Sequence, residues 1–286
     1  MVAGSTELLP PPGSDPAPGR EGSNVEGISP DEVHKRRPEN VWLQDAVHES
    51  PRSMRSRFEV PPRGVRLRFV DLIEVQRQIG ILQAHRQLGV PRNTVFVLDR
   101  IALKFVTRAT VADEPRNAGT VRAHIVATGA RGRPRSLSQH FSIEVPSGLL
   151  AVGTARASLI PQGVYDRVRR LPPESVPSEK RPTTSDSRYA GALVVDGRDP
   201  LISDHPSDHL TAMQVLADVE RVAVENFPSA GVRELKLAFY RYTDVEPAPL
   251  LRLNVAQSGR FQAEVTQRGA RSAKVTGVLD LREGKH

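Results

Sequence analysis

Asp71-Leu-Ile-Glu-Val-Gln-Arg-Gln-Ile-Gly-Ile-Leu-Gln-Ala-His-Arg-Gln-Leu88 is the stretch of sequence that decides the fold of this chain. Apolar residues return in it at three- and four-residue spacing, which predicts an amphipathic helix. Asp71 is a residue type that caps helix N-termini, and Gly89-Val90-Pro91 is a sequence that ends a helix. We therefore expect one long helix here.

Segments on both sides of this helix have the composition of β-strands. Two short segments, 40–45 and 58–61, precede it. Four longer segments follow, each rich in β-branched and apolar residues and separated from the next by turn residues. These four segments are 95–106, 120–128, 137–145 and 149–160. The N-terminal half is thus predicted to be a long helix followed by antiparallel strands.

The same order of elements occurs again in the C-terminal half. A short strand is predicted at 192–196 and a long helix at 208–227. Four predicted strands follow, at 235–245, 250–257, 261–267 and 272–281. Two copies of one α+β unit would give such an order, so we predict a tandem α+β protein.

Proline-rich segments bound the predicted units. The first 30 residues carry five prolines between residues 10 and 18 among Gly, Ser and Glu, and we predict a disordered tail there. Residues 171–184 carry four prolines with Ser, Glu and Lys, which is typical of a linker. We therefore divide the chain into a tail (1–30), a first domain (31–170), a linker (171–188) and a second domain (189–286).

Composition disfavours several classes of protein. The 286 residues include no cysteine, which excludes disulfides, thiolate metal sites and a cysteine nucleophile, and fits a reducing cytoplasm. No apolar run is long enough for a signal peptide or a membrane span. The net charge of +7 comes mainly from arginines spread along the chain, and aromatic residues are only 5%. We therefore do not expect nucleic-acid binding.

Two polar clusters are candidates for chemistry. Asp204-His-Pro-Ser-Asp-His209 places four titratable residues directly before the second predicted helix, beside a helix dipole that favours anions. An equally simple interpretation is that Asp208 caps the helix and the histidines lie in a turn. On the first helix, Glu74 shares a face with Arg77 and Gln78, a pattern that is also common on exposed helix surfaces.

Five short motifs resemble those of the A-factor biosynthesis family. Asp204-His-Pro-Ser-Asp-His209 with Met213 is similar to that family's Asp-His-Pro-x-Asp-His-x-Pro-Gly-Met, and Val195-Asp-Gly-Arg-Asp-Pro200 is similar to its Val-Asp-x-Arg-x-Pro. Glu74-Val-Gln-Arg-Gln-Ile-Gly80 resembles its Glu-x-x-Arg-Gln-x-Gly. Val33-His-Lys35 resembles its opening Val-His-Lys, and Gln44-Asp45 stands where it has Thr-Asp or Thr-Gly. The matches keep the family's order over nearly the whole chain.

The resemblance implies a tandem hotdog fold, in which each antiparallel sheet wraps around a central helix. The two units would form a pseudo-dimer with a continuous sheet surface and an acyl tunnel at their interface. The implied function is that of a cytoplasmic acyltransferase in the synthesis of γ-butyrolactone-type signalling molecules. It would join a β-ketoacyl group, delivered on acyl carrier protein, to a hydroxyl of dihydroxyacetone phosphate. No cofactor, metal, nucleic acid or membrane enters this expectation.

The resemblance also implies site residues in the first half. Glu74 would be the catalytic carboxylate, a general base whose pKa is raised by burial. Arg77 would be catalytic by holding a phosphate or the developing oxyanion, and Gln78 would donate a hydrogen bond to the substrate. A basic cluster before the helix is predicted to meet the acidic carrier protein. This cluster consists of Arg63, Arg66 and Arg68.

The second helix departs from the family pattern. Ala217 and Glu220 stand where the family has glutamate and arginine, and Asp218 and Arg221 follow one residue further along. We predict Arg221 as a catalytic residue and Asp218 as a substrate-binding residue, which requires a small rotation or a bulge of the helix. The predicted substrate-binding set is completed by His205, Asp208 and His209.

Three other interpretations stay open. A hotdog dehydratase would pair His205 or His209 with Asp218 and act on a β-hydroxyacyl thioester without a phosphorylated acceptor. A non-catalytic homologue would bind an acyl or lactone ligand. A metal site built from the residues of 204–209 is disfavoured, because side chains so close in sequence do not easily converge on one ion.

Overall fold

The computed structural model describes residues 27–62, 68–106, 117–129, 134–170, 189–194, 199, 204, 209–227 and 230–281. Its N-terminal half begins with two short 3-10 helices, Pro30–Val33 and Pro38–Asn40. Then follow β1 (Leu43–Ser50), β2 (Ser53–Glu59), α1 (Phe69–Leu88), β3 (Thr94–Phe105), β4 (Ala118–Gly129), β5 (Ser136–Val145), β6 (Gly148–Pro161) and α2 (Gln162–Arg170). The C-terminal half contains β7 (Tyr189–Ala192), α3 (Ala212–Asn226), β8 (Ala230–Phe239), β9 (Leu250–Val255), β10 (Arg260–Gln267) and β11 (Ala270–Leu281).

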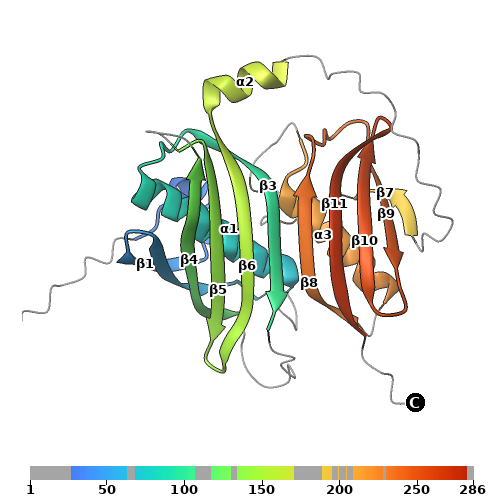
Figure 1. Cartoon of the computed structure of the whole chain (residues 1–286), viewed down its shortest axis with the longest axis horizontal. Coiled ribbons are helices and arrows are strands. Elements are labelled where there is room, and N and C mark those ends of the chain that lie inside the picture. Colours follow the sequence, from blue (N-terminus) through green and yellow to red (C-terminus); the bar gives the residue numbers. More distant parts are fainter. Residues whose placement is uncertain are drawn as a thin grey trace, which may run out of the picture.

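One antiparallel sheet runs through both halves (Figure 1). Within the described residues it has eleven strands, in the order β1-β2-β4-β5-β6-β3-β8-β11-β10-β9-β7. β3 and β8 join the halves, from Arg100 opposite Ala238 to Lys104 opposite Glu234. On either side of this pair lie β6 and β11, then β5 and β10, then β4 and β9. The strand order is therefore symmetric about the junction, as expected for two copies of one unit.

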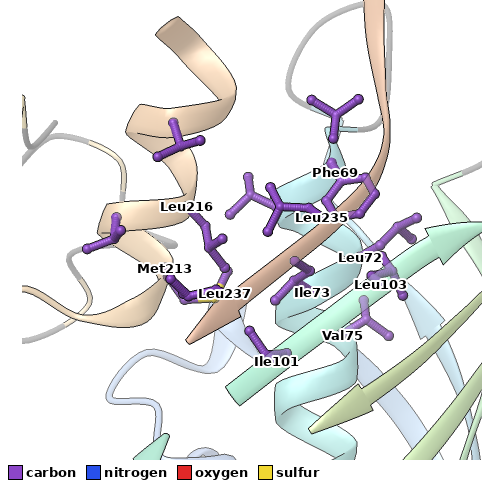
Figure 2. Packing of buried hydrophobic residues seen from close by; sticks show 14 of the residues in the cluster. Phe69, Leu72, Ile73, Val75, Ile101, Leu103, Met213, Leu216, Leu235 and Leu237 are labelled. Carbon is purple, nitrogen blue, oxygen red and sulfur yellow. The ribbon is translucent and has the colours of Figure 1, made fainter. Parts of the chain in front are cut away.

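The two long helices lie on the same face of the sheet, each behind the strands of its own half, and contact each other (Figure 1). Residues on β3 and β8 alternate, so that every second side chain points to the helix layer. Figure 2 shows the apolar side chains that meet there, each at most 5% exposed. They come from α1 (Leu72, Ile73, Val75), β3 (Ile101, Leu103), α3 (Met213, Leu216) and β8 (Leu235, Leu237). One core thus spans the two halves.

A polar contact across the junction fixes the start of α1. The carboxylate of Glu220 on α3 accepts hydrogen bonds from the backbone amides of Phe69 (2.7 Å) and Val70 (2.9 Å). These amides have no partner within the helix, and a carboxylate there also complements the helix dipole. Glu220 of the second half therefore caps the helix of the first half.

Several predicted boundaries were wrong. Helix α1 begins at Phe69, because Asp71 does not precede the helix but accepts a hydrogen bond from the Arg68 amide (3.0 Å) from inside the first turn. Helix α3 begins at Ala212 with Thr211 as its N-cap. The short helix α2 was not predicted, since its nine residues include a glycine and only three apolar or aromatic side chains. None of the helices in the described part of the chain is long and apolar enough to cross a membrane.

The predicted tail and linker fall mainly outside the described residues. The last four residues of the predicted tail are described, and the carbonyl of Gly27 accepts a hydrogen bond from Arg86 on α1 (3.1 Å). The predicted linker lies wholly outside, as do Arg63, Arg66, His205 and Asp208. The domain boundaries therefore stay predictions.

Candidate active site

A cavity of about 1170 Å³ is lined by residues of both halves. From the first half come α1, β3, β5, β6 and the segment around Lys35, and from the second half come 209–213 and 239–243. Its walls are largely apolar, with Phe96, Leu98 and Phe141 among them. A volume of this size and an apolar lining suit a long flexible ligand with a few polar groups.

A cluster of charged side chains at the cavity is centred on Glu74, whose side chain is fully buried. Glu74 Oε1 lies 3.1 Å from Lys35 Nζ and accepts hydrogen bonds from Arg77 Nη2 (2.8 Å) and Gln78 Nε2 (2.9 Å). Glu74 Oε2 accepts from Arg77 Nε (2.8 Å). Both carboxylate oxygens are thus occupied, and the Arg77 contact is bidentate, which fixes the guanidinium plane.

The charges around Glu74 decide its ionisation. Burial raises the pKa of the Glu74 carboxyl, but the neighbouring charges of Arg77 and Lys35 outweigh burial and hold the pKa at about 2. The expected raised pKa was therefore wrong: Arg77 was expected on the same helix face, but its bidentate pairing with Glu74 and the approach of Lys35 were not foreseen. A carboxylate with this pKa and with both oxygens occupied is a poor general base.

Arg77 is the member of this cluster that is most open to the cavity. Its side chain is 23% exposed, against none for Glu74 and 4% for Lys35. Arg77 Nη2 also donates to the carbonyl of Val33 (3.2 Å), and burial lowers the pKa of Lys35 against the attraction of Glu74. The arrangement presents a fixed guanidinium, and next to it an ammonium group, to whatever occupies the cavity.

Gln78 connects this cluster to the chain before β1. Its Nε2 also donates to the Asn40 carbonyl (2.8 Å), and its Oε1 accepts from the Trp42 amide (2.9 Å). Gln78 is fully buried and is not among the residues that line the cavity. In this arrangement Gln78 orients Glu74 and anchors the segment that follows Lys35.

His209 belongs to an aromatic group that also lines the cavity. Its Nδ1 lies 3.2 Å from the Tyr165 hydroxyl of α2, and its ring centroid lies 5.5 Å from that of Tyr242. Arg169 of α2 lies over the Tyr242 ring, 5.0 Å from the centroid. The same predicted cluster contributes Asp204, whose carboxylate accepts hydrogen bonds from the Arg36 amide and the Asn40 side chain. Of the residues between Asp204 and His209, the structure describes none.

Asp218 and Arg221 form a second ion pair on α3. Asp218 is fully buried and accepts from Arg221 Nε (2.8 Å) and from the Val194 amide (3.0 Å), while Arg221 Nη1 contacts Glu225 (2.6 Å). Neither residue is among those that line the cavity. The structure therefore does not bring Arg221 and Asp218 together with Glu74, Arg77 and His209.

Sequence reasoning missed two residues of the site. Lys35 was quoted as part of a motif, but no role was derived for it, since its approach to Glu74 depends on tertiary packing of the first 3-10 helix. Tyr165 lies on α2, a short and mainly polar helix that was not predicted. For a metal, no group of three His, Asp or Glu residues converges within the described ranges. His205 and Asp208 lie outside those ranges, so the metal-site alternative stays a prediction.

This chain is a tandem hotdog protein. The strand order of its sheet, its two central helices on one face and the cavity that both halves line define this class. The sequence model of the A-factor biosynthesis hotdog domain matches residues 20–161, so the chain carries a hotdog domain of the A-factor biosynthesis family. This match confirms the resemblance inferred from the short motifs of the first half, and the motifs at 195–200 and 204–213 lie outside the matched residues. A search of curated proteins gave no match to this sequence.

Solved structures agree on the fold. The chain is similar to a 12:0-ACP thioesterase from Umbellularia californica, with a TM-score of 0.54 and 13% identity over 82% of this chain and 98% of that one. It is also similar to an acyl-ACP thioesterase from Bacteroides thetaiotaomicron, with a TM-score of 0.51 and 13% identity over 80% of this chain and 98% of that one. At such identities the similarity establishes the fold alone.

Proposed function

We propose that this protein is an acyltransferase that moves a β-ketoacyl group from acyl carrier protein to a hydroxyl of dihydroxyacetone phosphate. The observation that carries the proposal is the cluster of Glu74, Arg77 and Lys35 beside a large, mainly apolar cavity. The A-factor biosynthesis domain, which includes all three residues, supports the same chemistry. The product would be an ester that leads to a butyrolactone-type signal.

The proposed reaction needs a stabilised oxyanion. The acceptor hydroxyl oxygen attacks the thioester carbonyl carbon, a C–O bond forms, and negative charge develops on the carbonyl oxygen. Donors that are already oriented towards that oxygen stabilise the transition state. Arg77 and Lys35 are in position to do this, and Glu74 acts by holding both. The C–S bond then breaks, and the carrier thiol leaves with the proton that the hydroxyl lost.

His209 is the proposed acceptor of the hydroxyl proton. When His209 Nδ1–H donates to the Tyr165 oxygen, Nε2 carries the lone pair that can take a proton. Glu74 is less suited to this task because its pKa is about 2. The dehydratase alternative loses support, because Asp218 is paired with Arg221 and is not among the residues that line the cavity.

We propose a contact surface for acyl carrier protein that relies on fewer arginines than the three predicted from the sequence. Arg68 contacts Asp71 (2.9 Å) and Asp199 (3.1 Å), so neighbouring carboxylates balance most of its charge. Charge reversal at Arg63 and Arg66 therefore tests this surface better than a change at Arg68. Carrier-protein affinity that is unchanged in both variants would exclude it.

Thiol release and product mass test the function. Purified protein is incubated with a β-ketoacyl thioester of the carrier protein, with and without dihydroxyacetone phosphate. Acyl transfer predicts thiol release that depends on the triose phosphate, together with an ester of the summed mass. Thiol release without the acceptor would indicate hydrolysis, and loss of water from a β-hydroxyacyl thioester would indicate a dehydratase. Binding without any turnover would favour the non-catalytic alternative.

A further inference from the structure

Two glutamines line the cavity on the side where α1 meets β5 and β6. Gln76 is fully buried and Gln139 is 5% exposed. Gln76 follows Glu74 by two residues, which places it about 200° around the helix from the charged cluster. The neighbouring lining residues here are apolar or small, among them Leu137, Phe141 and Ala155. Buried polar side chains in an apolar wall are unfavourable unless their polar atoms form hydrogen bonds.

The amide groups of both glutamines have a fixed orientation. Gln76 Nε2 donates to the Thr154 carbonyl (2.9 Å), and Gln139 Nε2 donates to Gln83 Oε1 (2.7 Å) and to the Gly80 carbonyl (3.2 Å). Since the NH₂ groups bind protein oxygens, the carbonyl oxygen of each amide remains. Gln76 Oε1 is buried without a hydrogen-bond partner among the described residues. A buried acceptor that lacks a donor costs free energy until one arrives.

Glycines make room for both oxygens. A Cβ atom at Gly153 would lie 2.4 Å from Gln76 Oε1, and one at Gly80 would lie 2.9 Å from Gln139 Oε1. Any larger residue at these positions would displace the amides. Gly80 follows Gln76 by four residues on α1, about one helical turn, so both amides lie at the same stretch of the helix. The wall therefore offers two hydrogen-bond acceptors along an otherwise apolar path.

We propose that Gln76 and Gln139 form a subsite that selects an acyl chain carrying a hydroxyl group. The hydroxyl donates its proton to a glutamine oxygen, which an unsubstituted chain or a keto oxygen cannot do. The hydroxyl would sit on a carbon beyond the β-keto group, because the carbonyl end lies at Arg77 and Lys35. This inference rests on the proposed function, in that it takes an acyl thioester as the ligand.

Binding of a ligand series tests the subsite. β-Ketoacyl pantetheine thioesters of one chain length, unsubstituted or with a hydroxyl at successive carbons, are titrated into the full-length protein by calorimetry. One net hydrogen bond predicts that one hydroxyl position binds roughly five- to tenfold more tightly than the unsubstituted chain. Gln76→Met and Gln139→Met are the test variants, two so that one misfolded variant does not decide the result. At least one should lose the preference and keep its affinity for the unsubstituted chain.

Gln44→Met is the matched control, because Gln44 bonds the exposed Glu59 (2.9 Å) and is not among the residues that line the cavity. This variant should keep the hydroxyl preference. A wild-type protein that binds the unsubstituted thioester but prefers no hydroxyl position overturns the subsite and leaves the proposed function intact, as would happen if water alone occupied the two oxygens. A preference that survives in both Gln76→Met and Gln139→Met overturns the assignment to these residues. Absence of binding by every thioester overturns the subsite and the proposed function together.

Discussion

The two central helices carry the same ion pair in different surroundings. In α1, fully buried Glu74 holds Arg77 three residues later, and in α3, fully buried Asp218 holds Arg221 three residues later. Glu74 has Lys35 as a second cation, whereas Asp218 has the backbone amide of Val194. The first pair lines the cavity and the second is not among its lining residues. A buried carboxylate that fixes an arginine is therefore a structural device in both halves, and its chemical use depends on what lies in front of it.

The two halves therefore contribute different groups to the cavity. The first half supplies the fixed cations, and the second half contributes His209, Met213 and Tyr242 to the lining. Glu220, which stands at the family's arginine position, caps α1. The altered second-helix motif thus stabilises the junction. This division leads to predictions that compare matched positions in the two helices.

The largest expected effect is on stability, from removing the two buried carboxylates. Glu74→Gln leaves Arg77 and Lys35 without their counter-charge in a buried setting, and should lower the free energy of unfolding by about 3–5 kcal/mol. Asp218→Asn should cost less, about 1–2 kcal/mol, because Arg221 is 39% exposed and water solvates its charge. Urea unfolding of both variants measures this difference. Equal losses in the free energy of unfolding would mean that the second cation, Lys35, does not make Glu74 more important for stability than Asp218.

The next largest expected effect is on catalysis. It is measured by replacing the arginine of each ion pair. Arg77→Met removes a preoriented donor to the oxyanion and should lower kcat/KM for acyl transfer by about 10²- to 10³-fold. Arg221→Met is the matched control and should leave kcat/KM nearly unchanged. Steady-state thiol release with saturating acceptor measures both. An equal loss in the two variants would show that the second pair also takes part in the reaction.

Lys35 should have a smaller catalytic effect. Lys35→Met removes the second cation, one charge-assisted hydrogen bond to the oxyanion, and should lower kcat/KM by roughly 10- to 100-fold. Lys35→Arg keeps the charge and should recover part of the activity. Full activity in Lys35→Met would leave the oxyanion to Arg77 alone. An inactive Lys35→Arg would mean that the amine does more than supply charge.

The smallest effect concerns pH and the junction. Burial raises the pKa of the Glu220 carboxyl to about 7 from its ordinary value of 4.5, and the charge of Asp71 adds to this rise. The Val70 and Phe69 amides and the charge of Arg68 oppose it. Because the folded state holds this proton more tightly, its stabilising contribution is complete below about pH 4.5 and is lost as the pH rises through about 7. The pKa of Glu74 lies below this window. Glu220→Gln should flatten the dependence of Tm on pH between about 5 and 8. An unchanged pH dependence would assign it to another group.

The first helix could be predicted from sequence because its signals are local. Apolar spacing predicted that α1 is a helix, and the positions of Glu74 and Arg77 three residues apart predicted their common side. It did not predict that α1 is buried almost all round, polar residues such as Gln76 and Gln83 included. The repeat of element order also predicted two units, since each helix needs a sheet to cover its apolar face. The N-cap of α1 was misplaced by three residues, at Asp71 instead of Arg68, because the first amides of the helix are capped by Glu220 from the other half.

The electrostatics of the site could not be predicted. The pKa of Glu74 depends on Lys35, which lies 39 positions earlier and reaches Glu74 only through the packing of the N-terminal segment. For the same reason, the sequence could not indicate that Asp218 and Arg221 would be absent from the cavity lining, since their spacing on α3 equals that of Glu74 and Arg77 on α1. The spacing of residues along a helix predicts which of them share a side of the helix. It does not predict which part of the protein that side faces.

The most direct test of the account is a crystal structure with a non-hydrolysable β-ketoacyl thioether of pantetheine. The account predicts that the ligand carbonyl oxygen lies within hydrogen-bond distance of Arg77 or Lys35, with the acyl chain extending past Gln76. A ligand whose carbonyl oxygen instead contacts Arg221, with the cavity at Glu74 unoccupied, would contradict it.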